Sequence, residues 1–221
     1  MEITAIALAR FVAFVETLDL NPQGIAYFPN MIPALVERYG FLKFPQKLED
    51  FDESKGVTFE GGRFENITVR QIQVFSHVLV AETASSTSDS ERIIEDALTW
   101  ASATFGLHYR PGMIKRKAYV SQVIFHSDHL LDKLHPVLLK ISALINSRVP
   151  KYFGRELEYR PAGLTISYDP GSIKNGTSAF SIEPRAEIPY SEHKYFSTAP
   201  LPTEEHIELL ALLEKELNPP Q

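Results

Sequence analysis

The stretch STSDSERIIEDALTWASATFG, residues 86–106, decides the fold because it carries the clearest helix signals in the chain. Ser88 and Glu91 have the spacing of a capping box, in which two side chains satisfy free amides at a helix start. Gly106 follows the last apolar position and marks the helix end. Apolar residues recur on one side of this helix, with charged residues on the other: Ile93, Ile94, Ala97, Leu98, Ala101 and Phe105. The stretch therefore predicts an amphipathic helix that lies on a sheet.

Segments on both sides of this helix have the composition of β-strands. Runs rich in β-branched and aromatic residues occupy four stretches: 56–64, 67–75, 78–83 and 118–126. Two more strand-like runs within 163–190 flank a loop rich in Gly, Asn, Asp and Pro, which predicts a hairpin. Pro184 argues that this hairpin lies at a sheet edge, because proline cannot donate to a strand ladder.

The remaining segments complete a mixed fold. If residues 3–15 form a strand, both of its faces are apolar, which favours a strand buried on both sides. Their alanines are also compatible with a helix. Helical patterns cover three further stretches, with Asn30 and Thr203 as caps: 30–40, 136–153 and 203–217. The order predicts a single mixed α+β domain over 1–221, with a largely antiparallel sheet covered by three or four helices. Residues 189–221 can form a C-terminal extension that packs back on it, and we find no internal repeat of fixed period.

The composition limits the function. The 28 acidic residues exceed the 22 Lys and Arg, so the net charge of −6 provides no global basic field for nucleic acid or anionic lipid. The chain has no cysteine, which excludes disulfides, thiolate metal sites and a cysteine nucleophile. The apolar run 3–15 is too short to span a bilayer and lacks the basic region of a signal peptide. We therefore expect a cytoplasmic protein with no membrane association.

Three histidines and two aspartates crowd the stretch FHSDHLLDKLHP, residues 125–136. A metal-assisted hydrolase would use His126, Asp128 and His129 as ligands and acid–base groups. However, His126 and His129 lie across a predicted strand-to-helix junction, and Asp128 suits a helix cap equally well. We therefore interpret the stretch as a junction, expect no bound metal or cofactor, and keep the hydrolase as an alternative.

One basic segment stands out in this acidic chain, HYRPGMIKRKAY at residues 108–119. Its cations can dock on a phosphate backbone or on an acidic protein surface: Arg110, Lys115, Arg116 and Lys117. The ordinary alternative is a solvated loop leading into a strand. A nucleic-acid-binding accessory protein that uses the 110–117 patch is thus a second alternative function.

The long connection IPYSEHKYFSTAPLPTEEH, residues 188–206, is a second interface candidate because it is unusually aromatic. Tyr190, Tyr195 and Phe196 can either pack across the sheet or form a contact surface.

The favoured function is a non-catalytic interaction or assembly subunit of a multi-protein complex, which binds a protein partner or associates with itself. The reason is that capping or solvation accounts for each chemical signal taken alone. Catalytic residues dispersed along a chain can still meet in the fold, so an enzymatic function remains an alternative.

Overall fold

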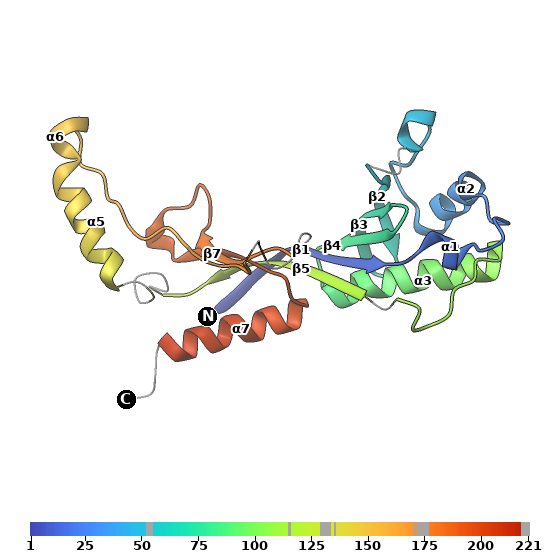
Figure 1. Ribbon diagram of the computed structural model, residues 1–221. Helices are drawn as coiled ribbons and strands as arrows, with labels where there is room; N and C mark the ends of the chain where they lie inside the picture. Colours follow the sequence, from blue (N-terminus) through green and yellow to red (C-terminus); the bar gives the residue numbers. More distant parts are fainter. Residues whose placement is uncertain are drawn as a thin grey trace. The chain divides into compact units, whose positions relative to one another are not determined.

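The computed structural model describes residues 1–51, 55–114, 116–128, 134, 136–169, 171 and 177–217. Its first half contains these elements: β1 (Glu2–Phe14), α1 (Thr17–Leu20), α2 (Phe28–Tyr39), η1 (Leu48–Phe51), β2 (Val57–Phe64), β3 (Ile67–Val74), β4 (Val78–Thr83) and α3 (Thr87–Phe105). The second half contains these: β5 (Arg116–His126), α5 (Pro136–Arg148), α6 (Pro150–Phe153), β6 (Leu164–Ile166), β7 (Phe180–Pro184), η2 (Tyr190–Glu192), β8 (Lys194–Ala199) and α7 (Thr203–Leu217) (Figure 1).

All eight strands belong to one antiparallel sheet, in the order β2-β3-β4-β1-β5-β8-β7-β6. The α+β class and the antiparallel sheet predicted from the sequence are therefore confirmed. Residues 3–15 form a strand rather than a helix, because β1 pairs with β4 in the register Ala9↔Thr83 to Phe14↔Val78. None of the helices in the described part of the chain combines the length and the apolarity needed to cross a bilayer.

The order of elements repeats along the chain. Each half has one long strand, a helix, three sequential antiparallel strands and a final helix: β1-α2-β2-β3-β4-α3 and β5-α5-β6-β7-β8-α7. The sheet order gives the first set of strands and then the corresponding strands of the second set in reverse. Our expectation of no internal repeat thus holds only for the sequence, since connectors of unequal length between corresponding elements remove any fixed period.

The chain divides into two compact units. The N-terminal unit comprises Ile6–Gln122 and Pro200–Glu204, and the C-terminal unit comprises Met1–Ala5, Val123–Ala199 and the chain from Glu205 onward. The long strands β1 and β5 contribute residues to both units. The single-domain organisation stays a prediction, as does the separate extension over 189–221.

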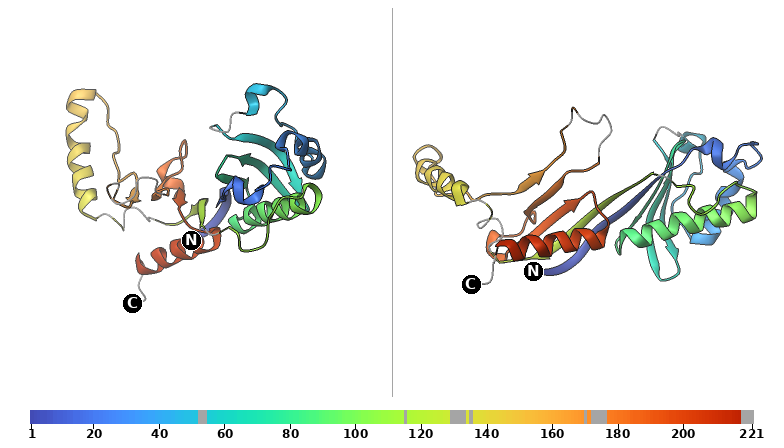
Figure 2. Two further views of the ribbon diagram at one scale, coloured as in Figure 1. Left: turned by 45° about the vertical axis from the view of Figure 1, so that its right-hand side comes forward. Right: turned by 60° about the horizontal axis from the view of Figure 1, so that its bottom comes forward.

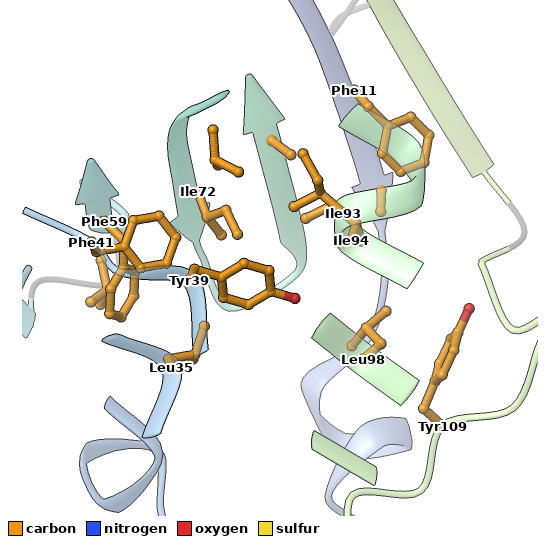
Figure 3. Packing of buried hydrophobic residues seen from close by; sticks show 14 of the residues in the cluster. Phe11, Leu35, Tyr39, Phe41, Phe59, Ile72, Ile93, Ile94, Leu98 and Tyr109 are labelled. Carbon is orange, nitrogen blue, oxygen red and sulfur yellow. The ribbon is translucent and has the colours of Figure 1, made fainter. Parts of the chain in front are cut away.

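The N-terminal unit buries one large apolar cluster between its part of the sheet and helices α2 and α3. Figure 3 shows Leu35 and Tyr39 of α2 directed into the same cluster as Ile93, Ile94 and Leu98 of α3. The predicted apolar face of 86–106 is thus the buried face of α3, and the two views of Figure 2 show this helix lying along the strands.

Three predicted helix caps are wrong, although both helix ends at glycine are confirmed. Thr203 is the first residue of α7 rather than its cap, and its Oγ1 accepts the Thr87 N–H at 3.0 Å. α3 begins earlier than the Ser88 capping box implies, because Ser86 is the N-cap and its side chain accepts the Asp89 N–H at 3.0 Å. Tyr27, not Asn30, precedes α2, and its side chain makes no cap hydrogen bond. Gly40 and Gly106 both adopt the left-handed conformation that ends a helix.

The C-terminal unit has a smaller core made by β5, β7, β8 and α7, with Val123, Phe125, Ile182, Tyr195 and Leu210 as its buried members. The predicted hairpin is confirmed as β6–β7, and it lies at the sheet edge because β6 is the last strand. Pro184 itself lies in β7, which is internal, since β8 pairs on its other side. Pro184 is tolerated there because β6 pairs only with residues 180–182, so no β6 carbonyl faces the proline nitrogen.

Candidate interaction surface

The aromatic connection before β8 forms a turn at the surface of the C-terminal unit. η2 places Tyr190 in an exposed position, and His193 follows in the left-handed region with φ of 49°. The His193 carbonyl accepts the Ser127 N–H at 3.1 Å, which ties this turn to the end of β5. The turn is therefore anchored to a neighbouring strand, as a recognition loop on a rigid scaffold needs.

The other two aromatic candidates from the sequence lie in β8. Tyr195 is only 6% exposed, and its ring packs on Phe125 with the centroids 5.6 Å apart. Phe196 is half-buried, and the Arg185 guanidinium lies 5.7 Å from its ring centroid. Tyr195 therefore serves mainly the core, while Tyr190 and Phe196 are accessible to a partner.

A hollow of about 350 Å³, including its solvent-open mouth, lies beside this turn. Its lining is basic and aromatic, with two prolines: Arg160, Pro161, Pro184, Tyr190, His193, Lys194 and Tyr195. No carboxylate is among these lining residues in the described part of the chain, although Glu158 accepts a hydrogen bond from Arg160 Nε at 2.7 Å. Because Glu158 neutralises Arg160, Lys194 provides the attraction for a negative group of a partner, and the rings and prolines provide the apolar contact.

A second hollow, of about 660 Å³ with its mouth, lies in the N-terminal unit and has mixed charge. Lys43 and Lys55 line it together with Glu49, Asp50 and Glu60, and Lys43 Nζ lies 2.8 Å from Glu60 Oε2. Three carboxylates oppose two lysines there, so opposite charges largely cancel and this hollow is less selective for a charged partner than the hollow beside Tyr190.

The described cations of the basic segment do not form one continuous region of positive potential. Lys117 forms an ion pair with Glu91, and this hydrogen bond raises the pKa of the Lys117 ammonium. The Arg116 guanidinium stacks over the Phe14 ring at 3.8 Å and is solvent-exposed, as is Arg110. Lys115 lies outside the described residues. Two exposed arginines thus account for the described positive charge that Glu91 does not neutralise.

His126, from the histidine-rich stretch, lies next to His193 of the turn that follows Tyr190. His126 ends β5 and its ring centroid is 6.2 Å from that of His193, while Asp128 is exposed and His129 lies outside the described residues. Within the part of the chain that the structure covers, no three histidine, aspartate or glutamate residues gather in a way that could hold a metal ion. The structure thus brings His126 to the candidate interface rather than to a described set of ligands.

Sequence reasoning missed a buried serine–histidine pair in the C-terminal unit. His206 Nε2 lies 2.9 Å from Ser197 Oγ, and both residues are fully buried. Ser197 Oγ donates its single proton to the Ser181 carbonyl at 2.8 Å, so Nε2 must be the protonated nitrogen that donates to Ser197. A general base needs the opposite arrangement, and burial closes the pair to substrate, so it stabilises the core. The sequence signal was the helical spacing of Thr203, His206 and Leu210.

The fold and this surface define the class of molecule: an antiparallel α+β protein with a basic, aromatic hollow beside a fixed turn. Comparison of the chain with protein-family models and with curated proteins finds no match.

Proposed function

We propose that the protein is a non-catalytic interaction or assembly subunit of a multi-protein complex, and that it docks on a protein partner through the hollow beside Tyr190. The observation that supports this is the lining of that hollow, which combines basic groups and aromatic rings. Tyrosine and arginine are over-represented among residues that dominate binding energy at protein interfaces. A partner segment with a carboxylate beside an apolar side chain satisfies both parts of the lining.

Two observations favour a protein partner over the alternative of nucleic acid. The net charge is −6, and Lys117 in the basic segment already pairs with Glu91. Arg110 and Arg116 then increase the rate at which a protein partner associates, rather than forming a binding site for a phosphate backbone. The metal-assisted hydrolase stays an alternative without a geometric observation that favours it. A cytoplasmic location belongs to the same proposal, since a chain without cysteine needs no oxidising compartment.

Affinity purification of the tagged protein from its source cells tests the proposal. We expect Lys194→Glu and Tyr190→Ala to reduce recovery of a specific protein partner at least about tenfold, because central interface residues carry most of the binding energy. Tyr152→Ala is the matched control, since this tyrosine is highly exposed but lies outside the hollow. Equal recovery with all three variants contradicts the proposal.

Nuclease treatment and salt separate the two partner classes. With a protein partner, recovery survives nuclease, and raising salt slows association of the purified pair only moderately. If recovery is instead lost with nuclease and with Arg110→Glu and Arg116→Glu, the nucleic-acid alternative replaces the proposal.

A further inference from the structure

Helix α5 exposes an apolar stripe that its counterpart α2 buries. Ile32, Leu35 and Tyr39 of α2, spaced by three and four residues, are 5%, 7% and 1% exposed. The same spacing recurs in α5 as Leu138, Ile141 and Ile145, which are 44%, 48% and 38% exposed. Val137 and Leu144 widen this stripe and are also exposed. On another side of α5, Asn146 exchanges hydrogen bonds with the backbone of Tyr159, at 2.7 Å and 3.2 Å, which holds the helix to its own connector.

The flank of α3 that receives α2 also has a counterpart, on α7. Thr87 and Thr203 are the first residues of the two helices and each donates its N–H to the other's Oγ1, at 3.0 Å and 2.8 Å. Taking these two as equivalent aligns the buried Ile94 with the buried Leu210. The same offset aligns two buried polar residues that hydrogen-bond to the preceding strand, Ser90 and His206.

The contacts between α2 and α3 show which side chains pack on this flank of α3. Arg38 Nη2 lies 2.7 Å from Asp96 Oδ1, Tyr39 Oη donates to Asp96 Oδ2 at 2.5 Å, and the Arg38 guanidinium is 5.3 Å from the Trp100 ring centroid. The position on α7 that corresponds to Asp96 is Leu212, which is 53% exposed, and the position that corresponds to Trp100 is the exposed Glu216. The flank of α7 is thus uncovered where that of α3 is covered.

Charge makes the two uncovered surfaces complementary. Residues 136–155 contain four cations and no acidic residue: Lys140, Arg148, Lys151 and Arg155. α7 carries five glutamates against a single lysine: Glu204, Glu205, Glu208, Glu214 and Glu216, with Lys215. The cationic border of the α5 stripe therefore complements the glutamates of α7, and the apolar stripe has the exposed Leu212 to cover, a combination that sets register between two helices.

The connectors indicate which copy of α7 is used. The segment that returns from α6 to the sheet, 154–163, is shorter than 40–56, the corresponding segment after α2. Short connectors restrict the return of a helix to its own sheet and favour exchange between identical chains. We propose that the stripe of α5 covers the α7 flank of a second copy, and reciprocally, in a helix-exchanged homodimer. This interface shares no residue with the hollow proposed to bind a partner.

Light scattering coupled to size-exclusion chromatography provides the first test. The full chain is expected to have the mass of a dimer, and Ile141→Asp should weaken dimerisation by on the order of tenfold or more, because a charge replaces buried apolar area. Leu18→Asp, at an even more exposed apolar residue that lies in the N-terminal unit, should stay dimeric. A wild-type chain that is monomeric at high micromolar concentration overturns the proposal, as does a dimer unaffected by Ile141→Asp.

Engineered cysteines test the pairing directly, and the chain has no native cysteine to interfere. Ile145→Cys and Leu212→Cys, at the positions equivalent to Tyr39 and Asp96, are co-expressed with different tags and then treated with a bifunctional thiol cross-linker, because side chains that meet only at their tips are too far apart at Cβ for a disulfide. We expect a cross-linked species that carries both tags, and none from either variant alone. The double variant at high dilution tests whether α5 instead packs on the α7 of its own chain. A cross-link within one chain there, without the mixed species, shows that it does and overturns the proposal, as does the absence of both products.

Discussion

At the scale of the residue, His206 makes the stability of the C-terminal unit depend on pH. Burial lowers the pKa of its imidazole from 6.5 to about 4. As pH falls from 6.5 towards 4, the unfolded chain binds a proton that the folded chain excludes, so stability present at neutral pH is lost in this window. The shift corresponds to a loss on the order of 3 kcal/mol.

His206→Gln should therefore flatten the dependence of the free energy of unfolding on pH between 6.5 and 4, measured by urea titration at several pH values. His108→Gln, at an exposed histidine, should keep the wild-type slope. An unchanged slope in His206→Gln would show that other groups cause the pH dependence.

At the scale of the element, the start of α3 distinguishes two neighbouring serines. Ser86 accepts the Asp89 N–H, whereas Ser88 Oγ lies at the surface, 3.4 Å from Glu204 Oε2. Ser86→Ala should cost about 1 kcal/mol of stability, because a lost cap leaves a helix amide without its partner. Ser88→Ala should change stability by less than about 0.5 kcal/mol. Thermal unfolding of both variants checks the difference, and the reverse order would restore the Ser88 capping box.

At the scale of the whole molecule, the question is whether the two units unfold together. β1 and β5 contribute residues to both units, so the two units share two continuous strands. Trp100 is the single tryptophan and lies in the N-terminal unit, where Phe105 contacts it edge-on, whereas far-ultraviolet circular dichroism reports on both units. We expect the two signals to give one coincident denaturant midpoint, as a cooperative single domain requires. Separate midpoints would show two independently folding units.

Sequence alone determined the elements whose signals are local. The periodicity of Ile93, Ile94 and Leu98 and the glycine at 106 predicted the face and the end of α3, and runs of β-branched and aromatic residues predicted the strands. These signals depend only on backbone geometry and on the apolar surface each segment must bury, so a single chain carries them. The cap at Ser86 was missed because three serines compete within five residues, and only the observed hydrogen bond decides among them.

Only the tertiary structure decided which distant residues meet. The contact between His126 and His193 and the hydrogen bonds between Thr87 and Thr203 join segments that lie far apart in the chain. The repeated order of elements likewise became visible only in the fold. The neutralisation of Lys117 by Glu91 and the burial of Tyr195 likewise depend on neighbours contributed by other elements. Periodicity states which side of a segment is buried but not what covers it, because strand order and helix placement follow from the free energy of the whole fold.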